Sequence, residues 1–145
     1  MALDENVGGC LSLEAGSDLS DKQFYAVKLN SSSQLALAGA GECAIGILYS
    51  KPNAAGVIAS VHPLDGRKTK GIAGGTISAG DILASNASGK LVAATAGRTN
   101  TSDAGSATDA LIGSYVIGVA VDSAVSNDIF QFLALPLGAV PTTAA

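Results

Sequence analysis

The stretch Asp81–Ala93, with the sequence DILASNASGKLVA, has the form of two short strands joined by a tight turn. Asp81–Ser85 and Lys90–Ala93 carry the apolar residues, and Asn86-Ala87-Ser88-Gly89 separates them. Because glycine adopts the left-handed backbone conformation at little steric cost, Gly89 can close a hairpin that contains a bulge. The stretch therefore predicts two antiparallel strands.

The rest of the chain shows the periodicity of strands. Side chains alternate with a period of two residues in segments 24–29, 57–62 and 116–121, which sends successive side chains to opposite faces of a sheet. No long window keeps a helical apolar stripe free of glycine, and no repeat of fixed period is evident. Turn-forming residues recur about every ten residues, as in barrels and sandwiches of short strands. They include Asn30–Ser33, Gly39–Glu42, Lys51–Asn53 and Asp65-Gly66.

These patterns predict an all-β fold, a compact barrel or sandwich of short antiparallel strands in a single domain over residues 14–145. Residues 1–13 should form an N-terminal arm and a first short strand. Residues 95–110 are rich in Ser, Thr, Gly and Asp and predict one long exposed loop. At most one short helical turn is expected, near Ser20–Phe24 with Ser20 as its N-cap.

The composition limits the classes of function. The 145 residues include no Trp, three Tyr and three Phe, so the apolar core should be thin and should gain from burial between subunits. A formal net charge of −4 argues against wrapping a nucleic acid, and the apolar run Leu111–Val121 is too short to span a membrane. The N-terminus lacks the pattern of a signal peptide, so we expect a soluble protein made in a cytoplasm.

A catalytic reading lacks the necessary residues. His62 is the only histidine, so a serine triad would have to use it, with Asp65 as the carboxylate closest in sequence. We expect instead a partly exposed histidine at a strand end. The glycines do not have the spacing of a dinucleotide fingerprint or a P-loop. We therefore predict that the protein is not an enzyme and binds no cofactor.

No metal site is expected either. The carboxylates are scattered and should cap turns, and a single histidine leaves too few ligands for structural zinc. Cys10 and Cys43 are read as small buried thiols rather than a disulfide.

Two parts of the chain are candidates for protein contacts. The first is the arm, in which Gly8-Gly9 could act as a hinge; its contact residues would be Ala2, Leu3, Asp4, Glu5, Asn6 and Val7. The second is the basic cluster of Arg67, Lys68 and Lys70, read as the tip of a hairpin. It is either a solvated tip or a patch that docks on an acidic protein surface.

The order of turns and strands resembles the capsid cement, or decoration, proteins of tailed bacteriophages. The resemblance covers roughly residues 14–135 and rests on an ordered series of segments rather than on one motif. These segments are Glu14–Lys28, Ala44–Tyr49 with Lys51-Pro52, Ala55-Gly56, Thr76–Asp81, Ala84-Ser85, Ser88–Lys90, Ile117–Ala120 and Asp128–Leu135.

The resemblance implies a virion protein, made in the bacterial cytoplasm, that binds the outer surface of an assembled icosahedral capsid. Its partners would be the major capsid protein and further copies of itself, as a homotrimer or less favourably a dimer. It would clamp neighbouring capsid subunits without catalysis, nucleic acid or membrane. The alternatives are another structural role, such as a major capsid, tail or fibre component, and a glycan-binding surface module. The scarcity of aromatic residues disfavours the glycan-binding module.

Overall fold

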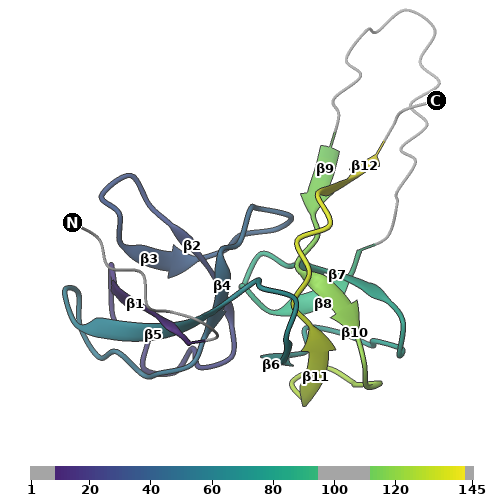
Figure 1. Ribbon diagram of the computed structural model, residues 1–145, viewed down its shortest axis with the longest axis horizontal. Coiled ribbons are helices and arrows are strands. Elements are labelled where there is room, and N and C mark those ends of the chain that lie inside the picture. Colours follow the sequence, from purple (N-terminus) through teal and green to yellow (C-terminus); the bar gives the residue numbers. More distant parts are fainter. Residues whose placement is uncertain (1–8, 95–111, 143–145) are drawn as a thin grey trace, which may run out of the picture.

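The computed structural model of the chain describes residues 9–94 and 112–142 (Figure 1). These residues contain no helix, which confirms the all-β prediction, and none could therefore cross a membrane as a helix. The strands are β1 (Leu11–Glu14), β2 (Ala26–Leu29), β3 (Leu35–Leu37), β4 (Gly46–Leu48), β5 (Ile58–Pro63), β6 (Lys68–Ile72), β7 (Ile82–Ser85), β8 (Leu91–Ala93), β9 (Ile112–Tyr115), β10 (Gly118–Ala120), β11 (Ile129–Leu133) and β12 (Ala139–Thr142).

Ten of these strands form two antiparallel sheets of five. One sheet has the order β1-β5-β4-β2-β3 and the other the order β6-β11-β10-β7-β8. In the first, an isolated parallel bridge joins Ala15, just after β1, to Leu35 at the start of β3. In the second, Ala73 and Leu91 make the equivalent bridge between β6 and β8. Each sheet thus curls until its edge strands meet, and we call the two units the first barrel and the second barrel.

The two barrels are structural repeats of each other. If β6, β7, β8, β10 and β11 are matched in chain order to β1–β5, the strand orders of the two sheets are identical. The hydrogen bonds match as well: the amide of Gly16 donates to Leu35 at 2.8 Å, and that of Gly74 donates to Leu91 at 2.7 Å. The sequence shows no repeat of fixed period, yet the fold contains a structural repeat.

The spacing of the repeats explains why the sequence hides them. Asn30 and Asn86 occupy equivalent turns and are 56 residues apart. Gly46 and Gly118 are also equivalent, because each begins the fourth strand of its barrel, but they are 72 residues apart. The difference arises from the segment between β8 and β10, which has no counterpart in the first barrel. A search for a fixed period cannot find such a repeat.

That extra segment includes β9, which pairs with β12 in a two-stranded ribbon that projects from the second barrel (Figure 1). The loop predicted at residues 95–110 lies outside the described residues. The single domain over residues 14–145 stays a prediction.

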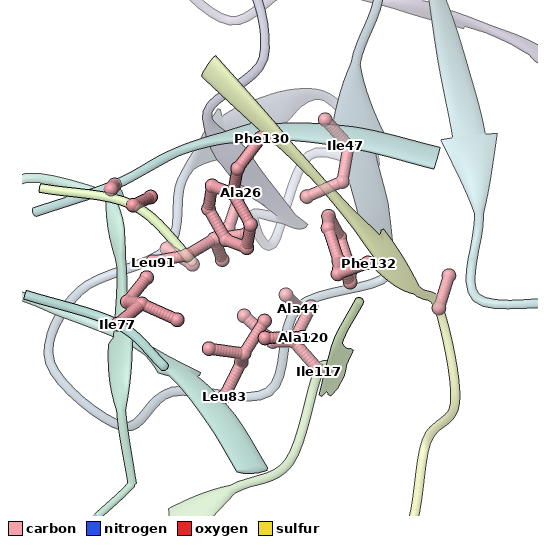
Figure 2. Packing of buried hydrophobic residues seen from close by; sticks show 14 residues of the cluster. Ala26, Ala44, Ile47, Ile77, Leu83, Leu91, Ile117, Ala120, Phe130 and Phe132 are labelled. Atoms are coloured by element: carbon pink, nitrogen blue, oxygen red, sulfur yellow. The ribbon is translucent and has the colours of Figure 1, made fainter. Parts of the chain in front are cut away.

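The hydrophobic interior is continuous between the second barrel and one side of the first. One cluster fills the first barrel and includes Leu35, Leu48 and Val61. The other fills the second barrel around Phe130 and Phe132, and it also takes in Ala26, Ala38, Ala44 and Ile47 from the first barrel. Figure 2 shows Ala26 and Ile47 beside the two phenylalanines.

The junction between the barrels is formed by a face of the first barrel against an open end of the second. Ala26, Ile47 and His62 lie opposite one another across β2, β4 and β5, and all three are buried. The amide of Ala26 donates to the carbonyl of Gly89 at 2.8 Å, and the hydroxyl of Tyr49 hydrogen bonds to that of Thr69. We call Ala26, Ile47, Tyr49 and His62 the junction face.

The local structure corrects one detail of the sequence prediction. Residues Ser20–Phe24 form two consecutive turns, closed by the amides of Lys22 and Tyr25, instead of a helical turn. Ser20 does not cap a helix; its amide and hydroxyl both donate to Asp18. The backbone of Phe24 is left-handed, with φ of 71°, which is incompatible with a helix at this point.

Candidate interaction surfaces

The contact residues predicted for the N-terminal arm lie outside the described residues. The arm is therefore still a sequence-based hypothesis. The described chain begins just before β1, which forms an edge of the first sheet and pairs with β5.

The basic cluster does not lie at a hairpin tip, which corrects the prediction. β5 and β6 belong to different sheets, so residues 64–67 connect the two barrels rather than two paired strands. Lys68 and Lys70 are exposed on β6, an edge strand of the second barrel, and they pair in register with Leu133 and Gln131 of β11. The hairpin reading failed because adjacent strands in a sequence usually pair, whereas here the chain crosses from one repeat to the next.

Arg67 differs from the two lysines in its surroundings. Its Nε donates to Oδ2 of Asp65 at 2.5 Å, and its amide donates to Oδ1 of the same carboxylate. Burial acts to raise the pKa of Asp65, but the hydrogen bonds from Arg67 and its positive charge outweigh this, so the pKa lies below its ordinary value. Arg67 thus stabilises the connection between the barrels, and Lys68 and Lys70 are the better candidates for contact with a partner.

A row of apolar side chains crosses the second barrel, and all of them are exposed except the half-buried Val119. Ile82, Val119 and Leu133 lie opposite one another on β7, β10 and β11, with Val121 just beyond β10, and we call these four residues the outer row. Ile82 and Val121 are each 41% exposed and Leu133 is 36% exposed. Lys68 continues the row on β6. Such a row on one sheet face is a candidate for contact with another protein.

Sequence reasoning had the signal for this row and did not use it. In segment 116–121, both alternating sets of residues are apolar or glycine. A strand with only one buried face normally alternates apolar with polar residues. Apolar residues on both faces therefore make the outward face a candidate contact surface.

The first barrel has partly exposed leucines around its interior cluster. Leu29 at the end of β2 is 44% exposed, and Leu11, Leu13 and Leu37 are half-buried against the interior cluster. The corresponding end of the second barrel is covered by the first barrel. In the described part of the chain, no segment covers Leu29 in the same way.

His62 is buried, with 6% of its surface exposed, so its prediction as a partly exposed histidine is wrong. It stands at the end of β5 as expected, but the junction covers it, and its ring packs against that of Tyr49 with centroids 5.3 Å apart. Its Nδ1 has no hydrogen-bond partner among the described residues. No nucleophile or carboxylate is bonded to it in that part of the chain, so a triad does not form there.

The two cysteines are also placed differently from the prediction. Both are free thiols, as expected, but both are exposed rather than buried. Cys10 precedes β1 and Cys43 lies in the connection between β3 and β4, so neither side chain belongs to a strand face that packs on a core. The described residues contain no group of three or more His, Cys, Asp or Glu that could hold a metal ion.

Exposed carboxylates serve the local structure. Hydrogen bonds from the side chain and amide of Ser20 lower the pKa of Asp18. The hydrogen bond from Lys28 is the main cause of the lowered pKa of Glu42, and the amide of Glu42 also closes the turn at Gly39. These groups hold turns and strand ends together, as the sequence predicted for the scattered acidic residues.

Comparison with known proteins identifies a fold but no family. Neither the models of known protein families nor the curated protein sequences include a match. Among solved structures, the chain is similar to the crystal structure of head fiber gp8.5 N base in bacteriophage phi29. The TM-score is 0.60 at 16% sequence identity, and the match covers 89% of this chain and 95% of that one. At this identity the similarity establishes a shared fold.

Proposed function

We propose that this chain is a structural protein of a phage virion that binds the outer surface of the capsid. The observation that carries the proposal is the shared fold with a phage head fiber base over nearly the full length of both chains. The resemblance of residues 14–135 to capsid cement proteins supports the same setting independently of the coordinates. The protein works without catalysis or a cofactor.

In this role the protein stabilises the shell as a homo-oligomer, preferably a trimer, that contacts neighbouring major capsid subunits. A standard protein interface buries about 1,600 Å², and each added contact in a lattice benefits from the high effective concentration of its neighbours. The exposed outer row and the partly exposed leucines provide apolar area for such contacts.

A second candidate role is the base of a fibre that projects from the head, because the similar structure is itself described as part of a head fiber. Both roles place the protein on the phage head, and immunogold labelling of virions with an antibody against this chain tests that location. Gold confined to heads is the expected result, whereas gold on tails only, or no gold on virions, would overturn the proposal. A head label at the end of a visible fibre would favour the second role.

Deletion of residues 2–9 is expected to weaken capsid binding or oligomerisation, because a polar arm that ends in two glycines can reach a neighbouring subunit. The measurement is the number of bound copies per capsid after co-sedimentation. A matched control is deletion of residues 143–145 at the other end. Normal occupancy by the chain without residues 2–9 would refute the role of the arm.

Reversing the charge of Lys68 and Lys70 with glutamate is expected to slow association with capsids about 10-fold at low salt, because exposed charges mainly affect the rate of encounter. The effect should shrink as salt screens the charges. The control, Lys22→Glu with Lys51→Glu, makes the same change in net charge elsewhere. Equal association rates for the two double variants would show that β6 is not the docking edge.

A further inference from the structure

The repeat lets each residue of the junction be compared with its counterpart in the other barrel. Cross-strand registers match Ala26 to Ile82, Ile47 to Val119, and His62 to Leu133. Backbone hydrogen bonds match Tyr49 to Val121. The amide of Tyr49 donates to the carbonyl of Ser60, and the amide of Val121 donates to the carbonyl of Gln131. The outer row of the second barrel is thus the counterpart of the junction face of the first.

The same positions are buried in one barrel and exposed in the other. Ala26 is fully buried and His62 is 6% exposed, whereas Ile82 is 41% exposed and Leu133 is 36% exposed. The junction face of the first barrel is covered by the second barrel, which comes next in the chain. The described residues contain no third barrel that could cover the outer row in the same way.

The opposite half of the junction also has an exposed counterpart. In the second barrel, the open end that receives the junction face is formed by Thr69, Ser85 and Gly89. Cross-strand registers match Thr69 to Leu11 and Ser85 to Leu29 of the first barrel. The hydrogen bonds of the two turns match Gly89 to Ser33. Ser33 has a left-handed backbone, with φ of 61°, as Gly89 does with φ of 83°. Among the described residues, nothing covers the outer row or this end of the first barrel as the internal junction covers their counterparts.

Residues that meet in the internal junction have counterparts of a different chemical character on the two exposed surfaces. Within the chain, Tyr49 and Thr69 meet as two polar groups that share a hydrogen bond. Their counterparts, Val121 and Leu11, are both apolar. Likewise Ser85 is 3% exposed and hydrogen bonded to the carbonyl of Gly39, whereas its counterpart Leu29 is a leucine that is 44% exposed. Both partners of the Tyr49–Thr69 contact thus change from polar to apolar together, as expected if these two surfaces contact each other.

We propose that the outer row of one copy docks on the open end of the first barrel of a second copy, in the register of the internal junction. Ile82 then takes the place of Ala26, and Ser33 that of Gly89. Such a head-to-tail contact between identical chains generates a ring when the rotation closes. The proposal names the contact behind the homo-oligomer of the proposed function, and it is tested in solution without capsids.

The test uses two single variants, Ile82→Asp in the outer row and Leu29→Asp at the open end, with masses measured by light scattering and native mass spectrometry. Both side chains are partly exposed, so the fold should be retained, as circular dichroism will show. Every head-to-tail contact needs the outer row of one copy and the open end of the first barrel of another copy. The wild type should be oligomeric, and each variant should be monomeric, with association weakened at least about 100-fold by an unpaired charge in the contact.

Mixing the two variants gives the decisive result, because the mixture still contains one intact surface of each kind. We expect a one-to-one dimer that grows no further. Ile129→Asp is the matched control, because its counterpart Ile58 stays 61% exposed when the first barrel forms the internal junction, and this variant should remain oligomeric. A monomeric wild type, an oligomeric Leu29→Asp variant, or a mixture that stays monomeric would overturn the proposal.

Discussion

The substitution Gly118→Ala is expected to destabilise the protein by about 4 kcal/mol or more, which is at the exceptional end for a point mutation. A Cβ atom at Gly118 would lie 1.9 Å from the carbonyl oxygen of Leu133 and 2.8 Å from the ring of Phe132. The oxygen belongs to the backbone of the neighbouring strand, so it cannot move aside as a flexible side chain would. Urea denaturation followed by circular dichroism measures the effect.

Gly46 is the counterpart of Gly118 and should show the same behaviour, because its added Cβ would lie 2.2 Å from the carbonyl oxygen of His62. Gly75→Ala is the control, since nothing lies within 4 Å of a Cβ at that position. It should leave stability unchanged within about 0.5 kcal/mol or raise it slightly. A Gly118→Ala protein as stable as the control would show that β10 and β11 do not approach as described.

Truncation of Phe132 to alanine should cost about 3–5 kcal/mol, because it leaves a large cavity in the interior of the second barrel. Phe132 is fully buried and is the largest such side chain in the described chain. Since typical domains are stable by only about 5–15 kcal/mol, much of the variant should be unfolded or insoluble at 37 °C. The midpoint of urea unfolding gives the loss directly.

Ile129→Ala provides the control for Phe132→Ala on the same strand. Ile129 points to the opposite face of β11 and is 57% exposed, so its truncation removes little buried area. We expect a loss below about 1 kcal/mol. Equal losses for the two variants would contradict the assignment of the inward and outward faces of β11.

The parts of the fold that were predictable depend on local turn chemistry. The hairpin at Asn86–Gly89 forms as expected, because the side chain of Asn86 accepts hydrogen bonds from the amides of Ser88 and Lys90 and Gly89 is left-handed. Such a turn is specified by its own residues and needs no distant contact. The alternation in segments 24–29 and 57–62 likewise places β2 and β5.

The turn at Phe24 shows where local chemistry misleads. Its counterpart in the second barrel is Gly80, which is left-handed with φ of 90°, as Phe24 is with φ of 71°. Glycine would have signalled a turn, whereas phenylalanine gives no such signal. The aromatic ring compensates by packing against Tyr49, with centroids 5.6 Å apart. Tertiary contacts therefore override the preference of the local sequence here.

Compensating changes in side-chain volume hide the repeat. In the second barrel, Gly71 lies opposite Phe130, and at the equivalent pair of the first barrel Leu13 lies opposite Ala59. Each barrel fills its interior with one large and one small residue, but on opposite strands. Because close packing constrains total volume more than the identity of each residue, the backbones can match while the sequences do not.

The interaction surfaces could be predicted only in part. Lys68 and Lys70 are exposed on an edge strand and remain candidates for a partner contact, although their hairpin does not exist. The burial of His62 could not be predicted from the sequence, because equivalent positions differ in burial only through the order of the barrels in the chain. That order becomes visible once the strand topology is known.

The most direct test of the proposed function is to titrate the purified protein onto capsids of its own phage that lack it. The bound copies are counted by cryo-electron microscopy, and the temperature of capsid disruption is measured on the same samples. We predict saturable binding to the outer surface at repeated positions of the lattice, together with a rise in the disruption temperature. Absence of saturable binding, or full occupancy with no gain in capsid stability, would contradict the role as a stabilising capsid protein.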